Sequence, residues 1–490
     1  MINWIKKHRT EGIILFVISI VALCIRLYKI DEYLTYLGDE GRDVRIVRDL
    51  ITKGDLPFIG PQTSVGNMYL GPLYYYLMAP FLFLSGLNPV GPAIMNALLG
   101  VIAVLLTWYV SRDWFGSKSA LITASLYALS PIAIIYSRSS WNPNPMPIFA
   151  LLSIYGIYQV WQNKKDNWLL VIGFTFAAAL QMHYLGLLLG PTLFIFWILR
   201  LRVLKTGTCE LKLFWKKTLS MIAVFLLMMS PLFLFDFKHQ GVNFSAMTKL
   251  VFGQSASINT NNFVTRLNEV VSLTIDDLVL SRQMNVSPYI VAGILFIFIL
   301  IIYRNFKKPG TKLLLTWLCI GLLGLGVYKN EVYIHYLGFI YPAIFMITGL
   351  AVTNIDKLFK FKWLSYLILF ALLYLSFRNS PLQQSPNNLL HRTETVVDLI
   401  IKESRGEPFN FALIAKQNYD ESYRYFLENK KANMLRGEDK ITNQLFVVCE
   451  DRDQCRPEGN SGYQIAIFGI AKVVEQWEVD YIKIYKMIHY

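Results

Sequence analysis

The chain carries about eleven apolar runs that are long enough to cross the hydrocarbon core of a membrane as helices. They lie near residues 13–27, 91–110, 120–136, 146–161, 169–183, 185–199, 218–235, 289–303, 313–328, 333–353 and 363–377. Apolar residues make up 54% of the sequence and charged residues 16%. A soluble protein has too little interior to bury so many apolar side chains. The sequence therefore predicts a polytopic α-helical membrane protein.

Lysine and arginine concentrate in alternate short loops between these runs, at residues 6–9, 112–118, 164–165, 200–217, 304–312 and 357–362. Basic loops mark the cytoplasmic side of a membrane protein. All of them fall on one side if the short apolar segment 71–84, interrupted by Pro80, lies at the interface or re-enters without crossing. We therefore predict a multi-pass protein of the cell (inner or plasma) membrane with a cytoplasmic N-terminus. Arg26 is then an interfacial anchor at the outer end of the first run.

The formal net charge of +14 would suit a nucleic-acid partner in a soluble protein. Here the positive loops account for the excess, and no basic aromatic patch or finger motif accompanies it, so we predict no nucleic-acid partner. The sequence also has no Walker A loop, no GxGxxG followed by a helix, no HExxH and no GxSxG. Nucleotide-driven transport and serine hydrolysis therefore lose support.

The composition changes after residue 379, where segment 380–386 has the Ser, Pro and Gln content of a linker. Helical patterns at 393–402 and 421–428, with strand-like runs at 409–415, 445–449, 464–468 and 477–485, predict a small α/β domain outside the membrane. The chain thus divides into a transmembrane domain (residues 1–379) and an extracytoplasmic domain (380–490). Cys449 and Cys455 are either a disulfide, which suits an oxidising compartment, or two free thiols.

Two adjacent acids, Asp39 and Glu40, follow the first apolar run with a glycine on each side. They open a predicted amphipathic helix over residues 39–52, which Gly54 ends and which we expect to lie on the membrane surface. One carboxylate can cap a helix, but two adjacent acids are more than a cap needs. An exposed carboxylate here can take the proton of an acceptor hydroxyl or help to hold a metal ion.

Further polar and aromatic residues gather at the outer ends of the runs. The substrate-binding candidates are Arg42, Tyr74, Arg138, Trp141, Asn142, Asn144, His183, Lys329, His335 and Tyr336. Arginine suits a phosphate group because its fork of donors matches the phosphate oxygens. Each candidate also has a structural alternative: snorkelling for the arginines of the surface helix, including Arg45 and Arg48, the aromatic belt for the tryptophan, and turns for the asparagines.

Four short motifs also carry a resemblance: residues 38–43 (GDEGRD), 70–76 (LGPLYYY), 114–116 (WFG) and 129–138 (LSPIAIIYSR). With them the chain resembles bacterial membrane glycosyltransferases of the C superfamily. Within that superfamily it is most similar to the protein O-mannosyltransferase-like family, which includes lipid A aminoarabinose transferases and proteins with rhizobial lipopolysaccharide-transferase-like domains. The resemblance does not extend to the tail.

The resemblance implies a sugar donor linked to a polyprenyl phosphate and an acceptor that is an envelope lipid, glycan or protein. It places the active site on the outer face, where the family's acidic motif matches Asp39 and Glu40, and it implies inversion at the anomeric carbon. Members often carry a second acid in the second external loop, and residues 139–145 have none. A divalent metal ion is therefore an open alternative and not an expected cofactor.

We accordingly predict Asp39 as the base, with Glu40 positioning it or assisting a metal. Arg138, Arg42 or Lys329 would hold the phosphate, and aromatic residues 74–76 would line a groove for the lipid tail. The alternative function is a transporter or flippase of lipid-linked sugars, which would place ionisable residues near the bilayer midplane and show internal repeats. A third reading is a structural or sensory membrane protein that binds through its outer domain.

Overall fold

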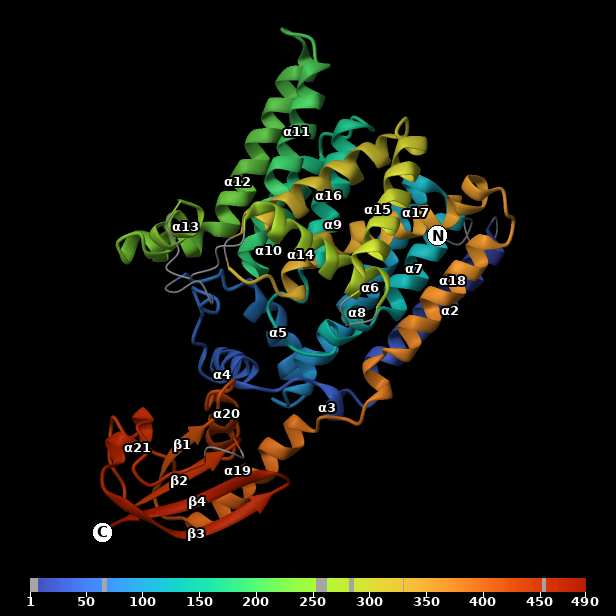
Figure 1. Cartoon of the computed structure of the whole chain (residues 1–490). Helices are drawn as coiled ribbons and strands as arrows, with labels where there is room; N and C mark the ends of the chain where they lie inside the picture. Colours follow the sequence, from blue (N-terminus) through green and yellow to red (C-terminus); the bar gives the residue numbers. More distant parts are fainter. Residues whose placement is uncertain (1–7, 64–67, 253–261, 282–285, 329, 452–454) are drawn as a thin grey trace.

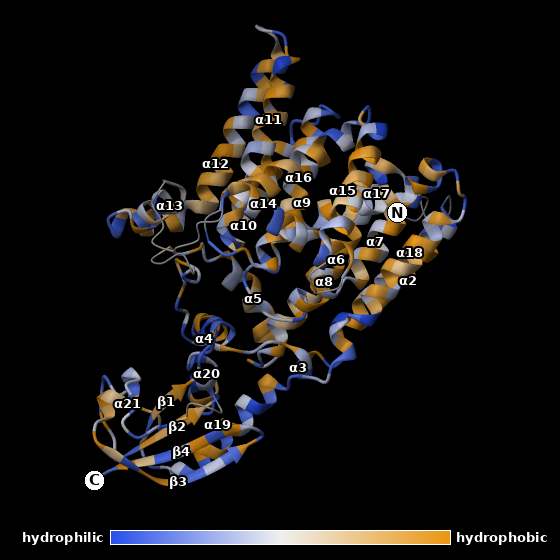
Figure 2. Cartoon of the chain, in the orientation of Figure 1, coloured by the Kyte–Doolittle hydropathy of each residue, from blue (hydrophilic) through white to orange (hydrophobic). Residues whose placement is uncertain are grey.

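The computed structural model describes residues 8–63, 68–252, 262–281, 286–328, 330–451 and 455–490. A bundle of helices forms the larger part, and a small sheet with three helices forms a separate body at the C-terminal end of the chain (Figure 1). The ribbon of the bundle is coloured mostly as hydrophobic, whereas α4 (Gly38–Lys53) and α20 (Glu421–Asn429), where the two bodies meet, are largely hydrophilic (Figure 2). The two bodies therefore meet through hydrophilic helices, whereas the bundle itself is mostly apolar.

Seven helices of the described residues are long and apolar enough to cross a membrane. They are α2 (Arg9–Leu27), α6 (Val90–Phe115), η1 with α11 (Tyr184–Leu188 and Leu189–Arg202), α12 (Cys209–Lys238), α15 (Pro288–Asn305), α16 (Pro309–Val327) and η3 with α17 (Ile334–Ile340 and Tyr341–Phe359). The shorter apolar helices are α5 (Leu73–Leu84), α9 (Met146–Trp161), α10 (Trp168–Met182) and α18 (Leu364–Arg378). The prediction of a polytopic helical protein is confirmed.

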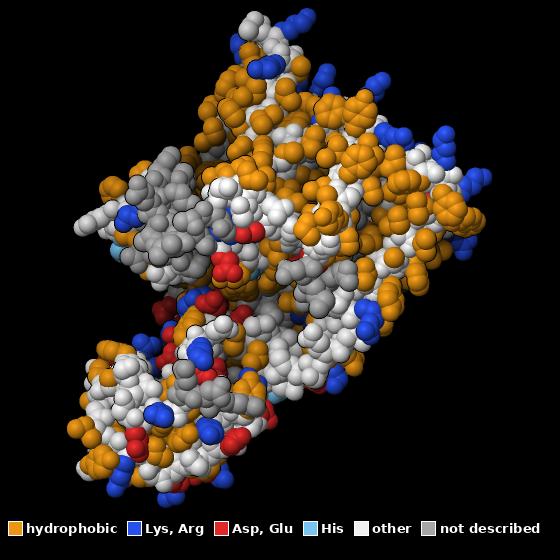
Figure 3. All heavy atoms as spheres, in the orientation of Figure 1, with side chains coloured by type: hydrophobic (Ala, Val, Ile, Leu, Met, Phe, Trp, Pro, Cys, Tyr) orange, Lys and Arg blue, Asp and Glu red, His pale blue; other side chains and the backbone are white. Residues whose placement is uncertain are grey.

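The η3–α17 stretch lies at the centre of the bundle. In the most apolar 18-residue stretch of η3–α17, 94% of the residues are buried. In the corresponding stretches of α12 and α15, 11% of the residues are buried. Within a membrane, a helix at the periphery of the bundle presents apolar side chains to lipid, whereas a central helix packs against other helices on all sides. On the face shown in Figure 3, the Lys and Arg side chains of the bundle gather mostly at the end away from the C-terminal body.

The predicted run 120–136 is two helices, α7 (Ser117–Leu129) and α8 (Pro131–Tyr136). Ser130 between them is extended, with ψ 123°, and its hydroxyl accepts a hydrogen bond from the amide of Ala133. Pro131 has no N–H to continue the helical ladder, so the break falls at this point. Between α12 and α15, the described residues contain α13 (Val242–Phe252), α14 (Phe263–Thr274) and the π-turn η2 (Ile275–Val279).

The stretch between α2 and α6 contains α3 (Ile30–Tyr33), α4 and α5. The predicted helix 39–52 is confirmed as α4, and Gly54 ends it with φ 74°, a conformation that glycine adopts without strain. The apolar stripe of α4 packs against α5, and its opposite side packs against α20 of the C-terminal body. The expected surface helix is therefore covered by protein on two sides.

The C-terminal body has a four-stranded sheet in the order β1-β2-β4-β3. β1 (Asn410–Ile414) and β2 (Gln444–Cys449) are parallel, and β4 (Ile482–His489) is antiparallel to both β2 and β3 (Ala471–Val479). The predicted helices are confirmed as α19 (Leu389–Ser404), preceded by the turn η4 (Pro381–Gln383), and as α20. Cys449 and Cys455 form a disulfide.

One predicted strand is wrong. Residues 464–468 lie in the short helix α21 (Tyr463–Phe468), because an apolar run of that length fits either kind of element and packing decides it. The predicted strand 477–485 is β structure, but it covers the end of β3 and the start of β4. Asp480 between them has φ 54° and lies in the turn that reverses the chain into a hairpin.

Candidate functional site

A cavity of about 320 Å³ lies where the start of α4, the second loop (residues 139–145) and the C-terminal body meet. Acidic side chains gather at this junction on the face shown in Figure 3. The polar and aromatic residues that line the cavity are Thr35, Asp39, Glu40, Tyr136, Ser139, Trp141, Asn144, Gln417, Asn418 and Tyr419. Four of the sequence-predicted candidates, Asp39, Glu40, Trp141 and Asn144, therefore come together from separate parts of the chain.

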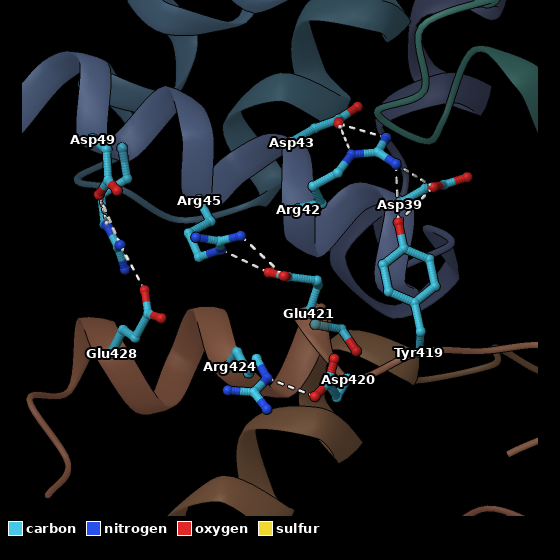
Figure 4. A network of polar contacts seen from close by, with 12 residues as sticks. Asp39, Arg42, Asp43, Arg45, Asp49, Tyr419, Asp420, Glu421, Arg424 and Glu428 are labelled. Carbon is cyan, nitrogen blue, oxygen red and sulfur yellow. Dashed lines mark hydrogen bonds and ion pairs between the residues drawn. The ribbon is translucent and has the colours of Figure 1, made fainter. Parts of the chain in front are cut away.

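Asp39 lies in the first turn of α4 with 43% of its side chain exposed. Its Oδ1 accepts hydrogen bonds from Arg42 Nη1 at 2.8 Å and from Tyr419 Oη at 2.6 Å (Figure 4). Within the described part of the chain, its other oxygen, Oδ2, has no hydrogen bond. One oxygen is thus held in place, and the other can accept a proton from a hydroxyl bound in the cavity.

Glu40 turns back onto its own helix. Its Oε2 accepts a hydrogen bond from the amide of Leu37 at 3.0 Å, which satisfies one of the free N–H groups at the helix start. Burial raises the pKa of Glu40 to about 8, so the carboxyl is mostly protonated at neutral pH. In this arrangement Glu40 stabilises the helical turn that carries Asp39. Of the two predicted roles for Glu40, this contact fits the positioning of Asp39.

Asp43 is a site residue that the sequence analysis did not single out. Its side chain is fully buried, and its Oδ1 accepts two hydrogen bonds from Arg42, from Nε at 2.9 Å and Nη2 at 2.7 Å. Burial raises the pKa of Asp43 to about 6, against the opposing effect of the Arg42 charge. The spacing of the two aspartates could have pointed to it. Asp39 and Asp43 are four residues apart and so lie on one face of a helix, where Arg42 can reach both.

Arg45 and Arg48 do not extend toward lipid, so their snorkelling interpretation is wrong. Arg45 Nε lies 2.6 Å from Glu421 Oε2, and Arg48 Nη2 lies 2.8 Å from Glu428 Oε2 (Figure 4). Both acids belong to α20. These two arginines attach the C-terminal body to α4.

Arg138 directs its donors to the end of α2. Nη1 donates to the carbonyl of Ile25, and Nη2 donates to the carbonyls of Tyr28, at 2.6 Å, and Lys29, at 3.3 Å. The last carbonyls of a helix have no partners within it, and a cation there is favourable. The structure therefore uses Arg138 as a helix cap; it does not line the cavity.

Arg26 is fully buried at the end of α2, so its interpretation as an interfacial anchor is wrong. Its Nη1 donates to the carbonyls of Ala22, at 3.2 Å, and Ala128, at 3.0 Å, while Nε and Nη2 have no hydrogen bond in the described part of the chain. Arg26 lines a cavity of about 30 Å³ that shares Tyr136 and Asn144 with the larger one. Nothing in the sequence around Arg26 indicates that it is buried beside the site.

Asn142 and Asn144 of the second loop have different hydrogen-bond partners. Asn142 is buried and donates from Nδ2 to the carbonyl of Met182 at 2.8 Å, which fixes the loop. Asn144 Nδ2 donates to the carbonyl of Ser139 at 2.8 Å, but its Oδ1 is buried without a hydrogen bond in the described chain. Asn144 is one of the residues that line both cavities.

Tyr74 lies behind the second loop. It is fully buried, and its hydroxyl contacts Ser140 Oγ at 2.9 Å and Asn96 Nδ2 at 3.0 Å. Tyr75 is buried as well, and only Tyr76 of this group is exposed. The expected lipid groove lined by all three tyrosines is not formed.

The remaining candidates form an aromatic cluster next to the cavity. The ring centroids of Trp141 and His335 are 4.5 Å apart, those of His183 and Tyr336 4.8 Å apart, and those of the two histidines 6.3 Å apart. Residues from three separate segments of the chain, each next to the end of a predicted apolar run, thus lie together. Lys329 lies outside the described residues.

The donor set does not fit a divalent metal ion in this arrangement. Arg42 already occupies the space between Asp39 and Asp43 and donates to an oxygen of each. Across the described residues, no group of three or more His, Cys, Asp and Glu side chains is placed to hold a metal.

Residues 70–235 match the family model described as dolichyl-phosphate-mannose-protein mannosyltransferase. The whole chain superposes on the crystal structure of ArnT from Cupriavidus metallidurans bound to undecaprenyl phosphate, with a TM-score of 0.65 and 12% identity over 96% of this chain and 97% of that one. This chain has the fold of the C superfamily of membrane glycosyltransferases. The predicted resemblance to that superfamily is confirmed.

Two further matches are more limited. The C-superfamily fold aligns with the apo Archaeoglobus fulgidus oligosaccharyltransferase at a TM-score of 0.55 and 14% identity, over 94% of this chain and 71% of that one. An uncharacterized protein of Aquifex aeolicus is 27% identical over 165 residues, which are 33% of this chain and 32% of the relative. The match therefore spans about a third of that relative's length.

Proposed function

We propose that the protein transfers a sugar from a polyprenyl-phosphate donor to a hydroxyl of an envelope lipid, glycan or protein at the outer face of the cell membrane. The observation that carries the proposal is Asp39, a half-exposed carboxylate with one oxygen held and the other unbonded, in a cavity at the end of the helical bundle. The fold supports it, since ArnT of the same fold was crystallised with undecaprenyl phosphate.

The reaction is a single displacement at the anomeric carbon. Asp39 Oδ2 takes the proton of the acceptor hydroxyl while the acceptor oxygen forms its bond to that carbon. The bond from the carbon to the phosphate oxygen breaks, and the polyprenyl phosphate leaves with the electron pair. A phosphate leaves as a stable anion, so the step requires a base and positive charge near the phosphate, but no general acid.

We assign the contacts with the donor to the cavity walls. Arg42 is the described cation closest to Asp39, and its charge would favour the departing phosphate. Asn144 Oδ1 would accept from a sugar hydroxyl, and Trp141, which contacts His335, offers an aromatic face to the sugar ring. Glu40 and Asp43 support these groups by holding the first turns of α4.

The outer-face location rests on charge. The C-terminal body and the cavity share one end of the bundle, and the basic loops gather mostly at the other (Figure 3). Positive loops stay in the cytoplasm, so we infer that the cavity and residues 380–490 are extracytoplasmic. The same location argues against the transporter alternative, whose binding residues would lie near the bilayer midplane.

The test is a transfer assay with the full chain in nanodiscs. Radiolabelled polyprenyl-phosphate hexoses and pentoses are supplied with membrane lipid, glycan and peptide acceptors, with magnesium, with manganese, or with a chelator. We expect Asp39→Asn to lower kcat by about 10²–10⁴-fold, as loss of a general base does. Asp55→Asn, an exposed acid just after α4, is the matched control and should behave as wild type.

Transfer at wild-type rate by Asp39→Asn would remove the catalytic assignment. If wild type transfers sugar from none of the donors, the proposal that the protein is a glycosyltransferase is wrong. Movement of the labelled donor across liposome membranes would then favour the flippase. We expect full activity with a chelator and no added metal, because the Arg42 guanidinium occupies the space between Asp39 and Asp43 that a metal ion would need.

A further inference from the structure

The C-terminal body contributes a side chain to the candidate catalytic carboxylate. Tyr419 Oη donates to Asp39 Oδ1 at 2.6 Å, and Arg42 Nη1 donates both to that oxygen, at 2.8 Å, and to Tyr419 Oη, at 3.0 Å. The three groups form a closed triangle across the boundary between the two bodies (Figure 4). Burial raises the pKa of the Tyr419 phenol above its usual range, so the hydroxyl keeps its proton and remains a donor.

The turn that carries Tyr419 is fixed from both bodies. Asn418 Oδ1 accepts from the amide of Gly38 at 2.8 Å, so it satisfies an N–H at the start of α4. Asn418 Nδ2 donates to Glu450 Oε1 at 3.0 Å, and Glu450 also accepts from Tyr423 Oη at 2.7 Å. The turn is therefore held by a partly buried polar network of the C-terminal body, which keeps the phenol next to Asp39.

The two glycines around the acid pair allow this approach. A Cβ at Gly38 would lie 2.5 Å from Cδ1 of the Tyr419 ring, and a Cβ at Gly41 would lie 2.4 Å from the backbone of Ser422. Any larger residue at either position would push the C-terminal body away from α4. The glycines that flank the acids in the sequence are thus explained by a contact with a distant part of the chain.

We propose that Tyr419 is a positioning residue for Asp39, so that the catalytic site is complete only while the C-terminal body is docked on α4. This inference rests on the proposed function of Asp39. Both donors bind Oδ1, and together they leave Oδ2 as the oxygen that meets the acceptor hydroxyl. Without the phenol, Arg42 alone holds the carboxylate, and a carboxylate that rotates spends less time in the reactive orientation.

The position of the docking contacts makes the proposal testable. Arg45 with Glu421, and Arg48 with Glu428, hold α20 on α4 without touching Asp39. A variant of these pairs changes docking strength alone. A variant of the Tyr419 hydroxyl changes the triangle alone, since phenylalanine keeps the ring over Gly38.

The experiment compares wild type, Tyr419→Phe, Glu421→Gln and Asp39→Asn as full chains in nanodiscs, with a polyprenyl-phosphate sugar that wild type uses. We expect Tyr419→Phe to lower kcat by about 10–100-fold, the scale of a misplaced catalytic group, with the donor KM within about twofold of wild type. Glu421→Gln should lower the midpoint of thermal unfolding and keep kcat.

The outcomes separate the two hypotheses. Wild-type kcat in Tyr419→Phe, with Asp39→Asn inactive, overturns the role of Tyr419 and leaves the proposed function intact. An equal loss of kcat in Glu421→Gln and Tyr419→Phe would assign the effect to docking of the whole C-terminal body and overturn the specific positioning role of the Tyr419 hydroxyl. Activity in Asp39→Asn, or none in wild type, overturns the proposed function and this inference with it.

Discussion

Arg45 and Glu421 lie 376 residues apart in the sequence and form a two-point ion pair, with Nε 2.6 Å from Oε2 and Nη2 2.9 Å from Oε1. About a fifth of each side chain is exposed. Arg48 and Glu428 pair along the same two helices. Because Asp39 and Tyr419 stand at the start of these helices, the ion pairs hold the two halves of the candidate site together.

A charge exchange tests this interface. Arg45→Glu and Glu421→Arg each leave two like charges facing one another, whereas the double variant restores an opposite pair. We expect each single variant to lower the midpoint of thermal unfolding and expose linker 380–386 to protease. Half-buried two-point pairs contribute about 1–3 kcal/mol, and the double variant should recover much of that. A double variant as unstable as the sum of the singles would show that the pair contributes nothing.

The amino-acid pattern predicted α4 well, including its start at the acids and its end at Gly54, because caps and apolar periodicity are local signals. It did not predict what covers α4. An amphipathic helix with a row of arginines has the same pattern whether it faces a membrane or another domain. Only the three-dimensional structure brings Glu421 and Glu428 to that row.

The same limit applies to the site. Asp39, Trp141 and Asn144 were predicted because polar residues at the outer ends of apolar runs stand out in the sequence. Tyr419 carried no such signal, since a tyrosine in a turn of a small α/β domain is ordinary. Arg26 was placed at the membrane surface by its position at the end of a run, yet the bundle buries it completely.

Gly41→Ala tests the close approach of α4 and α20. The new methyl group would lie 2.4 Å from backbone atoms of Ser422, which cannot move aside as a flexible side chain can. We expect a loss of about 1–3 kcal/mol in the free energy of unfolding and a weaker Tyr419–Asp39 contact. Gly293→Ala, in α15 with open space around it, is the control and should be neutral or slightly stabilising. An unchanged thermal midpoint in Gly41→Ala would contradict the packing.

Glu40→Gln tests the buried carboxyl through pH. Burial raises the folded-state pKa of Glu40 from the ordinary 4.5 to about 8. The folded protein therefore binds this proton more tightly, so the stabilisation is complete below pH 4.5 and is lost as pH rises through 8. Relative to Glu40→Gln, which accepts the Leu37 hydrogen bond at any pH, wild type should lose up to about 1.4 kcal/mol per pH unit in between.

Thermal unfolding of both proteins at several pH values between 5 and 9 measures this difference. The two midpoints should lie closest at the acid end and separate toward the alkaline end, with wild type lower. Parallel curves across the whole range would mean that Glu40 is ionised in the folded protein, and its role as a second base would then regain support.

Arg138→Lys decides between the two roles of the second-loop arginine. Lysine keeps the charge but carries its donors on one nitrogen, so it cannot span the carbonyls of Ile25, Tyr28 and Lys29. If Arg138 caps α2, the variant loses about 1–3 kcal/mol in the free energy of unfolding, because buried carbonyls are left without partners. The donor KM then stays within about twofold of wild type. If Arg138 instead binds the donor phosphate, the loss of two-point binding raises the donor KM about tenfold or more, with little change in stability.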